Sequence, residues 1–357
     1  MSVSDDISGV DIVRPRRRSG APTIYDVAEL AGVSPSTVSR ALSKPGRISA
    51  TTEAKIRVAA EHLHFRFNPM ARALPTGRTH TIALVVADIT NPVVFGIVRG
   101  AESAAKADGY TLVIAESQES GDAESEAIER LMPSVDGIVL ATTRLPSARI
   151  HEIAEQKPVV LINRAVEGIV GILPDIGSGV RELLTHLEEL GHRSIAYLAG
   201  PETSWISDQR FECMLDATER LGIALVEIGP NAPTIEGGRA ALRRVMASRT
   251  TAVIAFNDLI AIGLMQAAAA EGITVPHNLS VAGFDDIFGG ELITPALTTV
   301  RAQLVTAGER AVESLLAELA TTDSATQRPP NPLLTTTLVV RDSTSSPSKL
   351  ITRSAPD

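Results

Sequence analysis

The sequence contains little of what several classes of protein require. Its 357 residues include a single cysteine, Cys213, which excludes an intramolecular disulfide and a cysteine-based metal cluster. Aromatic residues make up only 3%, so the stacking platforms of single-strand nucleic-acid binders are missing. No apolar run reaches the length of a membrane span, and the N-terminus lacks the apolar core of a signal peptide. We therefore expect a cytoplasmic protein.

The motifs of common enzymes are also missing. There is no GxSxG, P-loop or HExxH sequence, and no GxGxxG stretch between a predicted strand and a predicted helix. The seven histidines show no spacing typical of metal ligands, because His62 and His64 are too close in sequence to form a helical pair. We expect neither an enzyme nor a bound metal or cofactor.

Charge is unevenly distributed along the chain. The net charge is −9, which taken alone argues against binding to nucleic acid. Residues 1–78, however, hold 12 basic and 7 acidic residues, whereas the remainder holds 21 basic and 35 acidic ones. A basic N-terminal region on an acidic body is the division expected when only that region contacts phosphate.

The segment Thr23–Leu42 has the pattern of a helix, a tight turn and a second helix. Thr23 is a predicted N-cap, Gly32 ends the first helix, and Ser34 caps a second helix that has Pro35 at its first position. A helical hairpin that merely packs is the alternative, but turn, caps and apolar spacing all agree with a DNA-binding helix-turn-helix. The side chains predicted to meet DNA are Ser34, Pro35, Ser36, Thr37, Ser39 and Arg40.

Two segments flank this motif. Ser49 is the predicted cap of a third helix, whose apolar face closes a three-helix core. Residues 1–21 are polar and end in RPRRRSG, which is typical of a disordered arm. Their arginines either contact the DNA backbone or form a solvated basic tail.

From residue 80 the chain alternates short apolar runs with helical segments such as Phe95–Asp108 and Ile260–Glu271. The runs are TIALVVADI, GYTLVIAES, VDGIVLAT, KPVVLINR, SIAYLAG, TAVIAFND and LSVAGFD. This α/β pattern predicts two parallel sheets of about six strands each, with helices on both faces. Ligands bind such sheets at the carboxyl ends of the strands.

Polar residues directly follow several of these runs, where a ligand crevice is expected. They are Asp88, Arg164, Asn257, Asp258, Asp285 and Asp286, and Arg210 follows the loop GPETSWISDQ that comes after SIAYLAG. Carboxylates, guanidinium groups and an amide in one cleft suit a neutral polyhydroxyl ligand. Capping of a following helix is the preferred interpretation for Asp258 and Asp286, and His192 is interpreted as a structural capping residue at a helix end.

The string TIYDVAELAGVSPSTVSRAL, followed by SATTEAKIRVAAEHLHFRFNPMARAL, resembles the lactose-repressor/galactose-repressor (LacI/GalR) family of transcriptional regulators. The resemblance extends to about residue 343. It implies an all-α helix-turn-helix domain joined to an α/β effector domain like a type I periplasmic binding protein, with two doubly wound parallel-sheet subdomains. The implied division is a disordered basic arm (1–21), a DNA-binding domain (22–67), a hinge helix and linker (68–79), an effector domain (80–343) and a disordered tail (344–357). Its N-subdomain spans about 80–175 and 304–332, and its C-subdomain about 176–303 and 333–343.

The resemblance also assigns a role to the stretch NPMARAL at residues 68–74. Asn68 and Pro69 fit the start of a short helix, which in the family folds on DNA and enters the minor groove. Leu74 matches the leucine that wedges open the central base step. Its alternative is a plain linker or core leucine. The implied DNA-contacting set therefore also contains Thr23, Arg47, Asn68, Arg72 and Leu74.

By the same resemblance, Arg210, Asn257 and Asp285 occupy effector-contact positions. Asp88, Phe95, Asn163 and Arg164 line the other side of the cleft, and Trp205 stands in a loop that frames it; Phe95 is equally compatible with a core position. The chain departs from the family pattern at Ile176, where asparagine is usual, at Cys213, where glycine is usual, and around Pro233, where no aromatic residue is available.

Together these features predict a ligand-responsive transcriptional regulator, most simply a repressor. A homodimer would bind near-palindromic operator DNA, and a small carbohydrate-like effector would change its operator affinity by a population shift. The short polar tail lacks a leucine heptad, so we expect a dimer and no larger assembly. The alternative is a solute-binding protein of a sugar transporter, against which the missing signal peptide and the DNA-binding motif argue.

Overall fold

The computed structural model describes residues 22–43, 46–65, 78–320 and 332–347. The chain forms two compact units, residues 1–77 and residues 78–357. Among the described residues, no helix is both long enough and apolar enough to cross a membrane. The predicted arm (1–21), most of the hinge and linker (68–77) and the end of the tail (348–357) lie outside the described residues.

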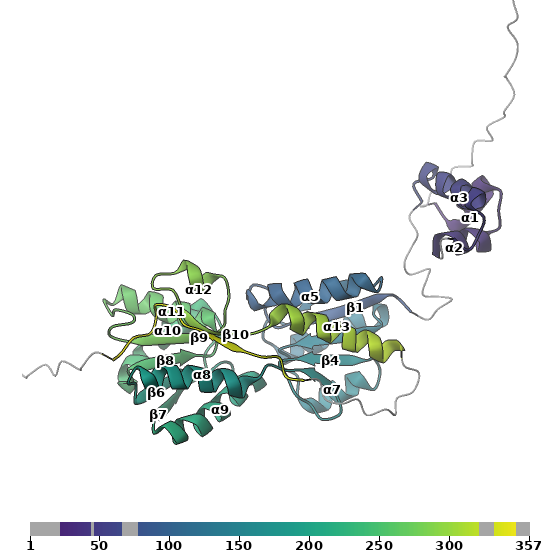
Figure 1. The fold of residues 1–357 in the computed structure, drawn as a ribbon. Coiled ribbons are helices and arrows are strands. Elements are labelled where there is room, and N and C mark those ends of the chain that lie inside the picture. Colours follow the sequence, from purple (N-terminus) through teal and green to yellow (C-terminus); the bar gives the residue numbers. More distant parts are fainter. Residues whose placement is uncertain (1–21, 44–45, 66–77, 321–331, 348–357) are drawn as a thin grey trace, which may run out of the picture. The chain divides into compact units, whose positions relative to one another are not determined.

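The first unit contains three helices, α1 (Ile24–Ala31), α2 (Pro35–Ser43) and α3 (Ala50–His62) (Figure 1). Gly32 ends α1 in the left-handed region at φ 66°, a conformation that glycine adopts without steric cost. Ser49 caps α3 by accepting a hydrogen bond from the Thr52 amide at 3.3 Å. The buried core is small and takes residues from every helix: Val27, Ala28, Val38, Ala41, Ile56 and Ala59.

The second unit begins with a five-stranded parallel sheet of order β2-β1-β3-β4-β5. Alternate residues of β1 face opposite layers, because successive side chains of a strand point to opposite faces. Ile82, Leu84 and Val86 belong to the same buried cluster as α5 and α13, whereas Ala83 and Val85 belong to the cluster of α6 and α7. The strands are β1 (Thr81–Val86), β2 (Thr111–Glu116), β3 (Gly137–Ala141), β4 (Val159–Ile162) and β5 (Val170–Ile172). The helices are α5 (Val93–Ala107), α6 (Gly121–Leu131), η1 (Met132–Ser134), α7 (Ser147–Ala154) and α13 (Leu304–Ala320).

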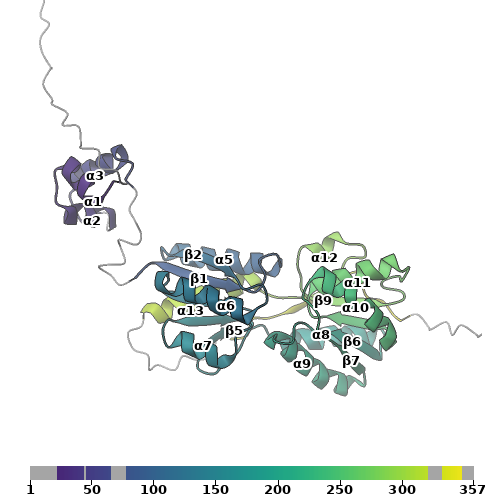
Figure 2. The same cartoon turned by 180° about the vertical axis from the view of Figure 1, so that it is seen from behind.

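A six-stranded sheet of order β11-β10-β9-β8-β6-β7 follows, with only β11 antiparallel. Helices α10 and α11 cover one face and α8 and α9 the other (Figure 2). The strands are β6 (Ser194–Leu198), β7 (Ala224–Ile228), β8 (Ala252–Ala255), β9 (Ser280–Asp285), β10 (Thr298–Arg301) and β11 (Thr337–Val339). The helices are α8 (Ile176–Glu189), α9 (Trp205–Leu221), α10 (Ile235–Ser248), α11 (Asp258–Ala270) and α12 (Gly289–Leu292).

Both sheets have the same doubly wound order. The first strand of each sheet, β1 or β6, lies between the second and the third strand of that sheet. The order in which strands are added therefore reverses beside the first strand. In open α/β sheets this switch point is where ligands bind, at the carboxyl ends of the strands. The predicted α/β class with two parallel-sheet subdomains is confirmed.

The two subdomains also share a helix-packing device. A Cβ added at Gly100 of α5 would lie 1.9 Å from the Val305 carbonyl oxygen of α13. A Cβ at Gly263 of α11 would lie 1.9 Å from the Ile235 carbonyl oxygen of α10. The absence of a side chain at these positions therefore permits backbone-to-backbone contact in each helix pair.

Three chain segments connect the two subdomains and lie together. The Asp175 amide donates to the Leu334 carbonyl at 2.7 Å, and the Leu334 amide donates to the Leu173 carbonyl at 2.8 Å. Between β10 and α13, the Gln303 side chain donates to the Thr335 carbonyl at 3.2 Å. After β10 the chain crosses back to the first subdomain, where α13 packs on the five-stranded sheet. It then crosses again, and β11 pairs with β10 in the six-stranded sheet.

The apolar runs of the sequence located seven of the strands, and four others were not among them. Strands β5 and β11 have three residues each, β7 is half-exposed, and β10 reads TTVR. Strands β5 and β11 are too short to show a clear pattern, β10 is interrupted by threonines, and β7 is an edge strand with three exposed residues, so none has the long apolar run of a buried strand. The two predicted helices are present with small shifts, at Val93–Ala107 and Asp258–Ala270.

His192 is structural and lies at the end of α8, as predicted, where its amide donates to the Leu187 carbonyl at 3.0 Å. The imidazole itself does not cap the helix. The His192 side chain is fully buried and contacts the Thr251 hydroxyl at 2.8 Å and the Ser345 carbonyl at 3.0 Å. A further contact joins it to the Ser280 hydroxyl at 3.2 Å. The imidazole therefore connects the segment after β11 to the N-terminal ends of β8 and β9.

We predict that the small core of the first unit, called the head from here on, tolerates no cavity. Ile56→Ala removes a fully buried side chain, which typically costs about 2–5 kcal/mol, a large fraction of the stability of a domain this size. The first unit of the variant should unfold at a lower temperature while the thermal transition of the second unit stays unchanged. Val58→Ala is the matched control on α3, because Val58 is 64% exposed. An unchanged thermal transition of the first unit in Ile56→Ala would contradict the described core.

We also predict that acid weakens the second unit. Burial lowers the pKa of the His192 imidazole below its ordinary value, and burial lowers the pKa of His186 in the same direction. The unfolded chain then binds more protons, so the free energy of unfolding should fall as pH drops through about 6.5. Denaturant unfolding at several pH values measures the slope.

His192→Gln should be less stable at neutral pH and should show a shallower pH dependence. His151→Gln, which replaces an exposed histidine of α7, is the control and should keep the parent slope. A parent-like slope in His192→Gln would refute the assignment.

Candidate functional site

The start of α2 presents a cluster of hydroxyl groups. The Ser34 hydroxyl accepts a hydrogen bond from the Thr37 amide at 3.2 Å and lies 2.8 Å from the hydroxyls of both Ser36 and Thr37. Ser34 and Ser36 are exposed, whereas Pro35, Thr37 and Ser39 are half-buried. Arg40 is also exposed, so the helix offers small donors and acceptors with a cation one turn further on.

The remaining predicted DNA contacts fall into two groups. Thr23 is exposed at the start of α1, where the Asp26 carboxylate accepts from its amide and its hydroxyl, each at 2.7 Å. Arg47 is exposed in the turn before α3. The other predicted contacts, Asn68, Arg72 and Leu74, lie outside the described residues.

In the second unit, a cavity of about 50 Å³ lies where strand ends of the two sheets face each other. This volume is below the roughly 300–1,000 Å³ of typical ligand pockets, so a ligand must open the cleft further. The polar residues that line it are Asp88, Asn91, Glu119, Thr142, Arg144, Asn163, Arg210, Asn257 and Asp285. The apolar ones are Ala87, Val93, Val94, Ile97, Ala141, Ile206, Pro233 and Phe256.

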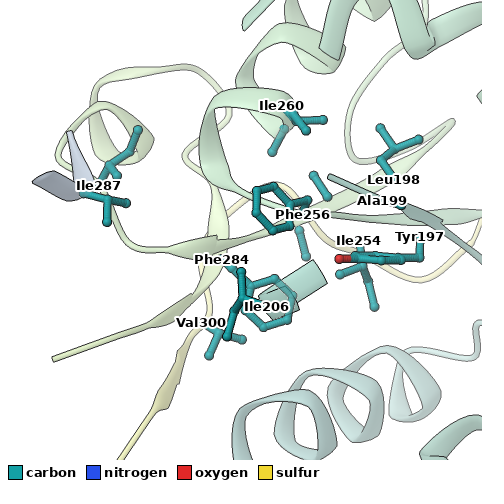
Figure 3. Close-up of a cluster of buried hydrophobic side chains, with 14 of the residues drawn as sticks. Tyr197, Leu198, Ala199, Ile206, Ile254, Phe256, Ile260, Phe284, Ile287 and Val300 are labelled. Carbon is teal, nitrogen blue, oxygen red and sulfur yellow. The ribbon is translucent and has the colours of Figure 1, made fainter. Parts of the chain in front are cut away.

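Arg210 is one of two buried cations that line this cavity, the other being Arg144. The Arg210 guanidinium carbon lies 4.2 Å from the ring centroid of Phe284 and 5.2 Å from that of Phe256 (Figure 3 shows both rings). One Nη donates to the Phe256 carbonyl, and the other lies 3.2 Å from the Asp285 carboxylate. Two aromatic rings, a carbonyl and a carboxylate thus compensate a largely desolvated charge.

Asp285 is the carboxylate partner of Arg210 at the cavity. It ends β9 at φ 108°, a conformation that is rare for a residue with a Cβ. Burial raises the pKa of its carboxyl, and the Arg210 guanidinium opposes that shift. The carboxylate remains at the cavity wall as an acceptor.

Asn257 has a structural duty in addition to its place at the cavity. Its side-chain oxygen caps α11 by accepting from the Ile260 amide at 2.9 Å, and its Nδ2 donates to the Pro233 carbonyl at 3.0 Å. The helix-capping role that the sequence suggested for Asp258 therefore belongs to Asn257.

The two capping predictions for Asp258 and Asp286 are wrong. Asp258 is fully buried and accepts from the Thr299 hydroxyl at 2.6 Å and the Ile287 amide at 2.9 Å. Burial raises the pKa of its carboxyl well above the ordinary value. Asp286 instead pairs with Arg301 at 2.5 Å and Arg341 at 2.7 Å. Both carboxyls serve to brace the strand ends beneath the cavity.

The structure brings five of the eight predicted effector residues to the cavity: Asp88, Asn163, Arg210, Asn257 and Asp285. The other three are not among its lining residues. Phe95 is 54% exposed on α5, which also excludes its alternative core position. Arg164 contacts the Ser147 hydroxyl at 3.2 Å while its buried Nε lacks a hydrogen-bond partner, and Trp205 packs against the core at the start of α9.

Sequence reasoning missed four polar lining residues: Asn91, Glu119, Thr142 and Arg144. Each follows β1, β2 or β3 by one to five positions, so a search a few residues beyond every apolar run would have found them. Among the described residues, no cluster of three or more histidine, cysteine or acidic side chains is arranged to hold a metal ion.

Comparison with known proteins identifies both units. Residues 23–68 match the model of bacterial regulatory proteins of the lacI family, and residues 184–344 match a periplasmic binding protein-like domain. The chain is 34% identical to the HTH-type transcriptional regulator GalR of Escherichia coli over 340 residues, covering 91% of this chain and 96% of GalR. It is 30% identical to the E. coli transcriptional repressor CytR, covering 86% of this chain and 92% of CytR.

Solved structures show the same architecture. The lac repressor dimer bound to operator and the anti-inducer ONPF matches with a TM-score of 0.80 at 26% identity, over 91% of this chain and 100% of that one. The regulator CelR in complex with cellobiose matches with a TM-score of 0.66 at 27% identity, over 90% of this chain and 99% of that one.

The matches span the head, both subdomains and the cleft between them. These relatives are regulators of transcription and not enzymes, and they do not favour the solute-binding alternative. The chain belongs to the lacI family of bacterial transcriptional regulators, with a helix-turn-helix DNA-binding unit and a periplasmic-binding-protein-like effector unit.

Proposed function

We propose that a homodimer of this chain represses transcription from a near-palindromic operator, with one head on each half-site. The hydroxyl cluster at the start of α2 supports this assignment, because small polar side chains at that position reach base edges in the major groove. The excess of basic residues in residues 1–78 supplies the phosphate contacts. Residues 68–79 serve as the hinge in this proposal, with Leu74 as the minor-groove wedge.

The effector in this proposal is a neutral polyhydroxyl compound, a sugar or a sugar derivative such as a nucleoside. The observation that carries it is the convergence of Arg210, Asn257 and Asp285 with Asp88 and Asn163 at one cavity. Such a set both donates to and accepts from vicinal hydroxyls. Relatives support the class: one is named a ribose operon repressor, and CelR is solved with cellobiose.

Effector binding would act by population shift. The cavity is shared by the two subdomains, whose three connecting segments are hydrogen-bonded to one another. A ligand that binds one relative arrangement of the subdomains more tightly than another shifts the protein toward the first arrangement. The size of the shift is set by the difference between the ligand's affinities for the two arrangements. In this proposal the arrangement decides whether the two heads engage the operator.

We predict that Ser36 and Thr37 determine base preference. Alanine at both positions removes hydroxyls that reach base edges, so the preferred half-site should change and its affinity should fall by about 1–3 kcal/mol. Selection from randomised operators reports the preference. Thr52→Ala, which removes a hydroxyl at the start of α3, is the control and should retain the parent sequence. A double variant with parent preference and affinity would show that the register assigned to α2 is incorrect.

We predict that Arg210→Ala abolishes the effector response and leaves effector-free operator binding near the parent level. The change removes the donor at the cavity and leaves Asp285 without its cation, at a cost of about 1–3 kcal/mol for the unsatisfied group. Operator titrations with and without effector measure the response. Arg239→Ala, at the half-exposed Arg239–Glu236 pair on α10, is the control.

Asn257→Ala should fail in the same assay and also lose stability of about 1 kcal/mol, because it removes the cap of α11. An effector response retained by both cavity variants would place the effector elsewhere.

A further inference from the structure

A second charged pair lies at the cavity, on the side of the five-stranded sheet. Arg144 Nε and Nη2 lie 2.7 and 2.6 Å from the same oxygen of Glu119, and Arg144 Nη1 donates to the Thr142 carbonyl at 3.0 Å. The Arg144 side chain is only 4% exposed and that of Glu119 is 24% exposed. A pair this buried is built into the wall and does not belong to the solvated surface.

The loops that carry this pair are fixed from beneath. The Glu124 carboxylate, itself buried, accepts from the Arg144 amide at 2.9 Å and thereby sets the position of the loop after β3. Glu119 has a left-handed backbone at φ 61°, and its amide donates to the Ala87 carbonyl beside β1 at 3.1 Å. Left-handed conformations are costly for residues with a Cβ and are enriched at functional sites. Thr142, at φ 57°, is a second example in the same cavity wall.

The pair keeps hydrogen-bonding capacity after its internal contacts are made. A guanidinium group has five N–H donors, and three of those of Arg144 are accounted for by Glu119 and Thr142. Both contacts to Glu119 go to one carboxylate oxygen, so the other takes none from Arg144. Donor and acceptor capacity side by side is what a pair of vicinal hydroxyls requires, and Arg210 with Asp285 offers the same combination from the other sheet.

The charge balance of the cavity restricts the ligand. Three carboxylates, from Asp88, Glu119 and Asp285, and two guanidinium groups, from Arg144 and Arg210, give the wall a formal net charge of −1. Each arginine already has a carboxylate partner. An anionic ligand would have to displace a carboxylate from an arginine or bind against the excess negative charge.

We propose that Glu119 and Arg144 are specificity-determining residues of the effector cleft: Arg144 positions Glu119, and the pair selects uncharged polyhydroxyl effectors over their phosphorylated forms. The inference rests on the proposed function, because it assumes that the effector binds in this cavity. It goes beyond that function by assigning the discrimination between neutral and anionic ligands to two residues of the five-stranded sheet.

The chain supplies a matched control pair. Arg149 of α7 lies 2.6 Å from the Glu129 carboxylate of α6 in the same subdomain, and neither residue lines the cavity. Glu129→Gln therefore makes the same charge change as Glu119→Gln, and Arg149→Gln the same change as Arg144→Gln.

Isothermal titration calorimetry of the full-length protein tests the proposal with four neutral probes: D-ribose, D-galactose, cellobiose and adenosine. D-Ribose, D-galactose and adenosine are also titrated as their phosphate esters. Inorganic phosphate is titrated separately. The parent protein should bind at least one neutral probe, and its ester should bind at least about tenfold more weakly because of the like charges at the wall. Inorganic phosphate should not bind detectably.

Glu119→Gln should narrow the ratio of neutral to phosphorylated affinity by about tenfold and should gain binding of inorganic phosphate, because Arg144 then lacks its counter-charge. Arg144→Gln should lower the affinity for the neutral probe, and the phosphate ester should still bind more weakly than the neutral probe. The two control variants should keep the parent ratio and the parent affinity.

Three results would overturn the inference: no neutral probe binds the parent, the ester binds more tightly than its neutral form, or Glu119→Gln keeps the parent ratio. Operator binding measured on the same preparations separates the two levels. If the parent binds operator but Glu119→Gln leaves the ratio of neutral to phosphorylated affinity unchanged, only the role of the Glu119–Arg144 pair is refuted. If the parent does not bind operator, the proposed function is refuted.

Discussion

The buried charge of Arg210 constrains how the strand ends of the effector unit are arranged around the cavity. A guanidinium removed from water is strongly unfavourable unless its surroundings compensate it. Here the compensation comes from Asp285 at the end of β9, the Phe256 carbonyl at the end of β8, and the rings of Phe284 and Phe256. Helix α9 must hold the arginine where both strands end, so the strand ends, the helix and the cavity form one connected arrangement.

The residues around Arg210 show how that arrangement is kept rigid. Asp258 lies fully buried beneath the strand ends and accepts from Thr299 and from the Ile287 amide. A Cβ at Gly283 would come within 2.2 Å of the Asp258 carboxylate, so the glycine leaves the space that this carboxyl occupies. A cavity wall braced in this way can respond to a ligand mainly by a change in how the two subdomains meet. This is the response that the proposed function requires, in which a small molecule changes the affinity for DNA.

Local features of the fold could be predicted from the sequence because their causes are local. Gly32 and Ser49 end or begin helices through contacts within four residues, and the apolar periodicity of the three head helices identifies their core. Cleft residues such as Asn257 and Asp285 were predicted because polar side chains lie at the carboxyl ends of buried strands, which meet at one edge of a sheet. No such reasoning could pair Arg144 with Glu119, which lie 25 positions apart in loops of separate strands. The same limit explains the error at Asp258, whose partner Thr299 is 41 positions away.

The central claim is that effector and operator bind at separate sites coupled through one protein, and reciprocity tests it most directly. The affinity for operator is measured with and without saturating effector, and the affinity for effector with and without saturating operator. Linkage requires the two ratios to be equal, and we predict a common factor of about 5–150, as is typical of coupled sites. An effector that binds the protein in the presence of operator as tightly as in its absence would contradict the account, because the cleft would then exert no control over DNA binding.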